Sequence, residues 1–556
     1  MQARGQMSLI NDTGAPLADL HVRLGSANSE IARITVPGAR LVMDDAENKY
    51  RIYHFDQPLA PGARLAVDFT ITREQAGFPA RGEDTNLIAN GSFMNNGDFM
   101  PQIGMSQDGF LQDRAKRRKY GLIPERRLPK LGDTAALERN YLGNADWVNS
   151  DITLATSAGQ TPIAPGRKVE DRVEGGRRIA RFVSPQPILS FFSVQSAAYA
   201  ERSADADGVK LTVYHHPSHA YNVDTMLASM KTSLAYYAKN FGPYQFDYAR
   251  IIEFPGYETF AQAFAGTIPF SESIGFLAAN DDPEKIDYVT YVTAHEVAHQ
   301  YWGHQIISAE MQGGTLFVET MAQYSALMVM KQLYGEDKIR RFLKYELDNY
   351  LRNRGGEIIE ELPLNRVENQ GYIHYRKGSL VMYLLADRLG EDRVNAMLAG
   401  ILAAHKFKGA PYLTSTTLVD GYKSLARNDA ERQLVSDLFE RITLYDLKAT
   451  AAATRKLADG RWETRLTVDA AKLYADGKGV EKAAPLADTI DVGLFTAKPG
   501  QGAFSRTDVL AMTRLPVKSG KQVLVLISKA KPVFAGIDPY NKYVDRNSDD
   551  NLVDVS

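Results

Sequence analysis

Apolar and polar residues alternate along roughly the first 205 residues of the chain, for example in residues 65–72 (LAVDFTIT). Gly/Pro turns such as Pro61-Gly62 separate these runs. A period of two is typical of β-strands that bury one face. The polar segment 205–208 (DADG) consists of residues typical of turns and indicates a domain boundary. We therefore predict a β-rich N-terminal domain over residues 1–207.

The middle of the chain changes to a helical period. After one more strand, residues 209–214, apolar residues recur every 3.6 positions, and a helix is expected from about Asn222 to residues 240–243 (NFGP). Another helix is expected from residue 316 to about 333, because Gly313-Gly314 breaks the chain and Thr315 can cap a helix that begins there.

The helix between these two has clear end signals. Asp282 is the predicted N-cap, Pro283 suits the first helical position, and Glu284 suits the positive end of the helix dipole. The apolar pattern stops at Gly303, which is typical of a helix C-terminus. This predicted helix contains residues 295–299 (HEVAH).

Histidines four residues apart in a helix predict a metal site. His295 and His299 lie one turn apart on one face, so both imidazoles can reach a single ion. Glu319, in the first turn of the next predicted helix, is the expected third ligand, and this set leaves zinc one open position for water. Glu296 would face the substrate and act as general base. Glu310 competes with Glu319, but it lies before the glycine pair in a predicted loop.

After about residue 445 the pattern returns to short strands. Residues 522–527 (QVLVLI) form one apolar run, and turns such as Asp459-Gly460 separate the segments. We interpret residues 446–556 as a small β-sandwich. With residues 208–445 as a separate domain, the fold class is a multidomain α+β protein.

Composition narrows the chemistry. The chain has 556 residues, which is too long for one ordinary core, and its 44% hydrophobic and 24% charged content is that of a globular protein. A net charge of −2 favours neither nucleic acid nor an anionic membrane as a partner. The sequence has no cysteine, so any metal must be held by histidines and carboxylates.

No run of about 18 apolar residues occurs, so no membrane-spanning helix is expected. The first five residues lack the apolar core of a signal peptide. The sequence is therefore expected to be either a cytoplasmic protein or a soluble piece of a longer chain.

Two further clusters each allow two interpretations. Residues 114–119, followed by Arg126 and Arg127, could form a nucleic-acid patch, but Pro124 and Pro129 interrupt the basic run and favour a solvated loop.

The second cluster, residues 215–219 (HHPSH), could hold another metal ion. Pro217 prevents a helix, and no acid stands at a matching offset. A strand end leading into the next helix is the favoured interpretation.

The stretch from His295 to Glu319, together with residues 375–378 (YRKG), resembles the M1 family of zinc aminopeptidases. The family motif is HExxH, then 18 residues, then Glu. The resemblance implies one zinc ion, peptide substrates and a thermolysin-like catalytic domain, here residues 208–445. It also implies that Tyr375 stabilises the oxyanion of the reaction intermediate.

Residues 295–304 (HEVAHQYWGH) and 319–324 (ETMAQY) look more specifically like a bacterial subgroup. In that subgroup an M1 domain is fused behind an ABC-transporter permease. This resemblance implies a tether to a membrane permease and an extracytoplasmic, periplasmic location, while a cytoplasmic location stays open.

Two departures from the family leave the predicted ligands in place. Between His299 and Glu319 lie 19 residues (319 − 299 − 1), one more than the family pattern. We expect the loop at Gly313-Gly314 to absorb the extra residue. The family's Asn-Glu-Gly around the third ligand is here residues 318–320 (VET).

A third departure concerns the substrate's free α-amine. The family's Gly-x-Met-Glu-Asn motif, whose Glu holds this amine, is absent from residues 260–272 (FAQAFAGTIPFSE). If Glu272 matches a later family Glu, Ala263 stands where the amine-holding Glu should be. Glu272 is then the best nearby acid to bind the amine together with the third ligand, with Glu258 as a rival, and Asn95 is a further candidate.

The sequence therefore predicts a zinc aminopeptidase. A zinc endopeptidase with the same centre but no amine recognition is the nearest alternative. A non-catalytic extracytoplasmic domain of an ABC transporter, binding peptides or a partner protein, is a second alternative. Glu296 argues against it, because a binding module needs no general base.

Overall fold

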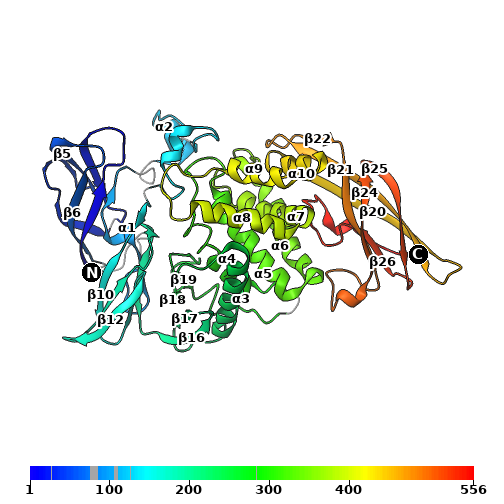
Figure 1. Ribbon diagram of the computed structural model, residues 1–556, viewed down its shortest axis with the longest axis horizontal. Helices are drawn as coiled ribbons and strands as arrows, with labels where there is room; N and C mark the ends of the chain where they lie inside the picture. Colours follow the sequence, from blue (N-terminus) through cyan, green and yellow to red (C-terminus); the bar gives the residue numbers. More distant parts are fainter. Residues whose placement is uncertain (27, 75–85, 106–110, 125–126, 144, 283–284) are drawn as a thin grey trace. The chain divides into compact units, whose positions relative to one another are not determined.

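The computed structural model describes residues 1–556 except 27, 75–85, 106–110, 125–126, 144 and 283–284 (Figure 1). The chain forms two compact units. The first unit comprises Met1–Arg127, Leu142–Leu227 and Gln245–Ala278. The second comprises Leu128–Tyr141, Ala228–Tyr244 and Ala279–Ser556. The boundaries predicted near residues 207 and 445 remain predictions.

The N-terminal sheets of the first unit confirm the predicted alternation. In β6 (Arg64–Arg73), Leu65, Val67, Phe69 and Ile71 are buried, and exposed or half-buried residues stand between them. Buried side chains from neighbouring strands complete this core. The two sheets here have the orders β1-β6-β3 and β4-β5-β2-β8, with β1 (Gln2–Ile10), β2 (Leu17–Arg23), β3 (Ser29–Thr35), β4 (Ala39–Asp45), β5 (Tyr50–Leu59) and β8 (Gln102–Ile103).

Short antiparallel strands make up most of the rest of the first unit. They are β7 (Ser92–Asn95), β9 (Trp147–Val148), β10 (Asp151–Ser157), β11 (Thr161–Ile163), β12 (Arg167–Glu174), β13 (Arg177–Val183), β14 (Ile188–Leu189) and β15 (Ser193–Ala197). They pair in the orders β11-β15-β7, β10-β13-β12 and β14-β9.

A sheet of mixed direction contains the segment predicted as a boundary. β16 (Ala200–Ala206) pairs antiparallel with β17 (Val209–His215), so Asp207-Gly208 is a hairpin turn within one sheet. β18 (Tyr248–Phe254) and β19 (Thr267–Ser271) continue this sheet with parallel pairing. The strand predicted over 209–214 is confirmed.

The stretches around the two ambiguous clusters form helices. α3 (Val223–Phe241) follows the HHPSH segment and ends before Gly242, as the sequence predicted. The basic stretch predicted as a loop instead forms the short helix α2 (Arg114–Lys119). Asp113 caps this helix, its carboxylate accepting the backbone N–H of Lys116 at 2.7 Å. Arg126 lies outside the described residues.

The second unit contains the helices of the chain's middle region. They are α4 (Tyr288–Ala298), α5 (Met321–Tyr334), α6 (Glu336–Arg354), α7 (Gly378–Leu389), α8 (Glu391–His405), α9 (Ser415–Leu425) and α10 (Asp429–Phe439). Two wide π-helical turns, η3 (Leu316–Thr320) and η5 (Tyr372–Lys377), lead directly into α5 and α7.

The predicted start of the HExxH helix is wrong. α4 begins at Tyr288 with Asp287 as its N-cap, whose carboxylate accepts the backbone N–H of Thr290 at 3.1 Å. Asp282 precedes the helix in irregular chain, and Pro283 and Glu284 lie outside the described residues. Asp287 is the better cap because Asn280 and Tyr334 also donate hydrogen bonds to its carboxylate.

Two further end predictions need correction. α4 ends at Ala298 with His299 as C-cap, earlier than the predicted stop at Gly303. Thr315 is already helical, and its hydroxyl makes no capping hydrogen bond. Because Thr315 lies within the turn that opens into η3, its side chain is not placed to accept from the first backbone amides.

The last part of the second unit consists of two four-stranded sheets, as the short alternating runs predicted. In the first, β21 (Trp462–Ala475) pairs with β20 (Ile442–Lys456), β22 (Glu481–Ala484) and β25 (Gly520–Ser528). The second has the order β24-β23-β26-β27, with β23 (Ala487–Phe495), β24 (Val509–Lys518), β26 (Phe534–Ile537) and β27 (Leu552–Asp554).

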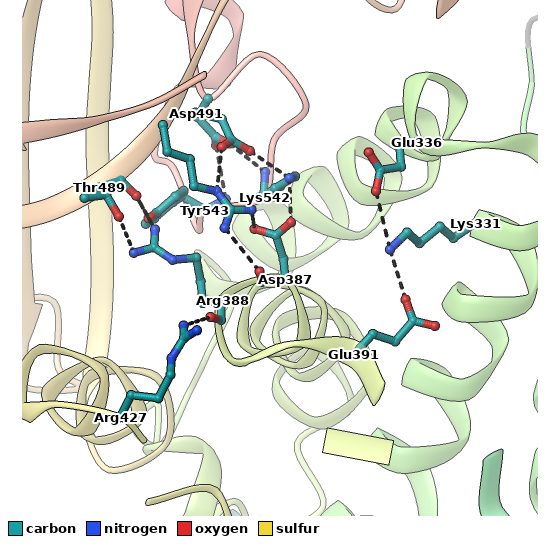
Figure 2. A network of polar contacts seen from close by, with 12 residues as sticks. Lys331, Glu336, Asp387, Arg388, Glu391, Arg427, Thr489, Asp491, Lys542 and Tyr543 are labelled. Atoms are coloured by element: carbon teal, nitrogen blue, oxygen red, sulfur yellow. Dashed lines mark hydrogen bonds and ion pairs between the residues drawn. The ribbon is translucent and has the colours of Figure 1, made fainter. Parts of the chain in front are cut away.

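Paired charges join α7 to these strands within the second unit (Figure 2). Asp387 on α7 and Asp491 on β23 both accept hydrogen bonds from Lys542, at 2.8 and 2.7 Å. Arg514 bridges the same two carboxylates. Because Lys542 is buried, this pairing satisfies a charge that would otherwise be costly.

Among the described residues, no helix is long and apolar enough to span a membrane.

Candidate active site

Three predicted ligands converge in the second unit. The Nε2 atoms of His295 and His299 lie 3.0 Å apart. Glu319 Oε2 lies 3.5 Å from the first and 3.3 Å from the second. Tetrahedral zinc with bonds of about 2.0–2.1 Å separates its ligand atoms by about 3.3 Å. The donor set and its spacing therefore fit a zinc ion.

A backbone carbonyl fixes the orientation of one imidazole. His299 Nδ1 lies 3.0 Å from the carbonyl oxygen of Trp302. Because a carbonyl can only accept, Nδ1 is the donor, and the lone pair of Nε2 is left to face the other ligands. This outer contact is of the kind that holds metal-binding histidines in place.

The third predicted ligand comes from the π turn that precedes α5. Glu319 lies in η3, where Leu316 and Phe317 are fully buried. π-helical turns inside longer helices are rare and are frequently found at functional sites. Burial of the apolar part of this turn anchors the backbone from which the Glu319 carboxylate projects.

The pKa values of His299 and Glu319 are both shifted by their surroundings. Burial alone would lower the pKa of His299, but the charge of Glu319 and its hydrogen bond raise it to about 9. Burial would raise the pKa of Glu319, yet the two histidines hold it well below its usual range. A cation bound here replaces the shared proton, so we expect its binding to release protons.

Glu296 and Tyr375 lie beside the ligands. Glu296 is buried next to His295 on α4, and its charge contributes to the pKa of both His299 and Tyr375. The ring of Tyr375, in η5, has its centroid 5.9 Å from that of His295. Burial, the charge of Glu319 and a hydrogen bond to it raise the pKa of Tyr375, so its hydroxyl keeps the proton and can donate.

Sequence reasoning missed Tyr141. Its backbone N–H donates to the carbonyl of Ser308 at 2.7 Å, which joins this segment to the chain after α4. Burial and the charge of Glu319 raise the pKa of its phenol, and that phenol in turn affects Tyr375. No motif marks Tyr141, and the alternating pattern placed it in the N-terminal domain, so the sequence carried no signal for it.

A buried carboxylate supports the site from behind. Glu346 on α6 is fully buried and accepts hydrogen bonds from Tyr291 at 2.8 Å and Gln323 at 2.9 Å. Its other oxygen accepts from Arg376 at 3.0 Å. Since these partners belong to α4, α5 and η5, Glu346 links the segments that carry His295 and Tyr375 to α5, the helix that directly follows the π turn of Glu319.

The remaining candidates are placed elsewhere. Glu310 pairs with Arg139 at 3.1 Å and is not among the converging ligands, in agreement with the preference for Glu319. Asn95 ends β7 and caps the short helix α1 (Asn96–Phe99), and Glu272 directly follows β19. Asn95 and Glu272 both belong to the first unit.

The matching family confirms what these ligands suggest. Residues 225–437 match the sequence profile described as the peptidase family M1 domain. The chain carries an M1 metallopeptidase domain. It extends from within α3 to within α10 and so includes the ligand helices, Glu296 and Tyr375.

Aminopeptidases are among the relatives of the M1 domain. Endoplasmic reticulum aminopeptidase 2 of Homo sapiens is 23% identical over 261 residues, covering 44% of this chain and 26% of that protein. Aminopeptidase M1 of Arabidopsis thaliana is 25% identical over 273 residues, covering 47% of this chain and 30% of that protein. The chain thus spans less than a third of the length of these relatives.

Proposed function

We propose that the M1 domain is a zinc aminopeptidase that removes residues from the amino terminus of peptides. The observation that carries this proposal is the convergence of His295, His299 and Glu319 at 3.0–3.5 Å with Glu296 and Tyr375 beside them. The similarity to aminopeptidases supports the amino-terminal specificity.

Each of the two flanking side chains has a role in this reaction. Zinc, when bound, polarises the scissile carbonyl and makes water a better nucleophile. Glu296 accepts a proton from the attacking water and passes it to the leaving amine. Tyr375 donates a hydrogen bond to the carbonyl oxygen as negative charge develops there.

Recognition of the free α-amine is the finer part of the proposal. We propose Glu272, whose carboxylate can pair with a charged amine, and Asn95, whose side-chain oxygen can accept a hydrogen bond from it, as the binding residues. Glu272 is partly exposed, so a charged group can approach it from solvent. Ala263, which stands where the family places its amine-binding Glu, is buried and brings no charge.

A paired substrate comparison tests the function. Aminoacyl-amides and short peptides are offered with a free and with an acetylated amino terminus, first as purified, then after chelation, then after zinc is added back. We expect hydrolysis of the free substrates only, loss on chelation and recovery with zinc. Equal cleavage of acetylated peptides would favour the endopeptidase alternative. Zinc binding without hydrolysis of any substrate would favour a non-catalytic binding domain.

The wider organisation of the protein is also proposed rather than shown. We propose three domains, at residues 1–207, 208–445 and 446–556, the second thermolysin-like and the third a β-sandwich. The tether to an ABC-transporter permease, with its periplasmic location, stays a prediction from the sequence resemblance, and the aminopeptidase relatives give it no support.

A further inference from the structure

A second group of metal-ligating side chains lies in the first unit. His219, Glu253 and Glu272 each bring one ligand atom to within 4.8 Å of the others. His219 Nδ1 makes a hydrogen bond to Glu253 Oε1 and lies 3.9 Å from Glu272 Oε2. We refer to these three residues as the strand-end cluster.

The position of the strand-end cluster follows from the sheet. β17, β18 and β19 run parallel, so their carboxyl ends lie at one edge. His219 comes from the segment after β17, Glu253 is the penultimate residue of β18, and Glu272 directly follows β19. The carboxyl ends of parallel strands are the usual place for ligands in open sheets with helices.

Backbone amides hold both carboxylates in place. Glu253 Oε2 accepts the N–H of His216 at 2.6 Å, and Glu272 Oε1 accepts the N–H of Gly256 at 2.8 Å. The other oxygen of each carboxylate is thereby directed to His219. A Cβ at Gly256 would lie only 3.1 Å from Glu272 Oε1, so glycine leaves room for this contact. Fixed outer contacts of this kind orient metal ligands.

The exposure of the strand-end cluster suits an exchangeable ion. The Glu253 side chain is 4% exposed, whereas those of His219 and Glu272 are 21% and 29% exposed. A cation can therefore enter from solvent, contact all three side chains and keep water in its remaining positions. Arrangements of one imidazole and two carboxylates suit zinc and manganese.

We propose that the strand-end cluster is a second divalent-cation site, with His219 Nδ1, Glu253 Oε1 and Glu272 Oε2 as ligands, so that Glu272 can bind the substrate amine only when the cation is absent. The sequence argument against a metal at residues 215–219 considered only acids close along the chain. The fold supplies acids from two other strands, which that argument could not find.

Counting bound zinc tests this inference without any measurement of activity. The full chain is dialysed against Zn²⁺, and bound metal is measured by mass spectrometry. We expect two equivalents in the wild type, one in His219→Ala and one in Glu253→Gln. His54→Ala is the matched control, because His54 also pairs with a carboxylate, Asp19 at 2.8 Å, but with only one. It should keep two equivalents.

The outcomes separate this site from the M1 centre. His295→Ala should lose one equivalent and keep the one that depends on His219. One equivalent in the wild type, removed by His295→Ala alone, would overturn the strand-end site and leave the proposed function intact. Retention of two equivalents in both His219→Ala and Glu253→Gln would also overturn it. A repeat with Mn²⁺ shows which of the two ions the site prefers.

Glu272 gives a second, milder test. Glu272→Gln keeps the size of a partly exposed side chain and should fold normally. We expect Glu272→Gln to lower the affinity for the second zinc ion by at least about tenfold. Even contacts outside the ligand set change metal affinity by about 10–100-fold. Unchanged metal affinity together with a higher KM for free-amine substrates would instead assign Glu272 to the substrate amine and overturn its role as ligand.

Discussion

Burial and the charge of Glu319 act in the same direction on Tyr375 and raise its pKa, so the phenol remains a hydrogen-bond donor at neutral pH. His374, next to it, is affected in the opposite sense, since burial lowers its pKa to about 4 and keeps the imidazole neutral. At this scale the site thus presents a neutral donor and a neutral ring beside the carboxylates.

Replacing Tyr375 by Phe removes this donor. We expect kcat to fall by about 100- to 1,000-fold, the usual effect of losing one oxyanion donor, with a smaller change in KM. Steady-state kinetics on a free-amine substrate measure both. Tyr372→Phe is the control, because Tyr372 lies in the same π turn but donates to Glu357. A raised KM with unchanged kcat would make Tyr375 a binding residue.

Replacing Glu296 by Ala removes the proposed base and leaves the three ligands in place. We expect zinc content to stay as in the wild type while nearly all turnover is lost. Metal analysis and rate measurement on the same preparation provide the test. Glu310→Ala, which removes a carboxylate paired with Arg139, should retain both zinc and turnover. Substantial turnover in Glu296→Ala would contradict the mechanism.

Helix ends and turns decide how the ligands meet. The 3.6-residue spacing of apolar positions predicted the helices around His295 and Glu319, because this spacing can be read from the sequence without knowledge of tertiary contacts. The N-cap could not be predicted, since Asp282 and Asp287 are equally good caps by residue type. Asp287 is chosen by contacts with Asn280 and Tyr334 that exist only in the folded protein.

Glu346 holds the segments around the site together, so its removal should destabilise all of them. Glu346→Ala leaves Arg376 without its partner and removes the acceptor for Tyr291 and Gln323. We expect a loss of roughly 3–5 kcal/mol in the free energy of unfolding, as for other broken buried pairs. Denaturant unfolding measures it. Lys344→Ala, on the same helix and paired at the surface, should cost at most about 1 kcal/mol.

At the scale of the whole molecule, the sequence predicted the succession of strands, helices and strands. The convergence of the three candidate metal ligands was also predictable, because all three fall in one local motif. Neither the order of strands in a sheet nor the strand-end cluster could be predicted. His219, Glu253 and Glu272 meet through parallel pairing of β17, β18 and β19, and such pairing leaves no local pattern.

The pH dependence of overall stability should include a contribution from Asp545. Burial raises the pKa of this carboxyl from 3.8 to about 7. A raised folded-state pKa means that the folded protein binds the extra proton between about pH 4 and pH 7. Its contribution to stability is therefore present below about pH 4 and lost as the pH rises through about 7.

Asp545→Asn removes this titration. Thermal or denaturant unfolding of both proteins from pH 4 to pH 8 gives the difference in stability. We expect the free energy of unfolding of the variant to rise relative to that of the wild type as the pH rises through this window. Asp549→Asn, at an exposed neighbour that pairs with Lys344, is the matched control for the loss of a carboxylate. A flat difference for Asp545→Asn would show that Asp545 has an ordinary pKa.

The π turn at Glu319 bears on how such proteins are found. A π turn holds about one residue more than an α turn, so the extra residue between His299 and Glu319 can be accommodated inside the helix as well as in the loop before it. Spacing in a motif then reports helix geometry as well as loop length. A search that demands 18 intervening residues would pass over this chain, although its ligand atoms converge at zinc distances. Allowing one inserted residue would recover it and any others built in the same way.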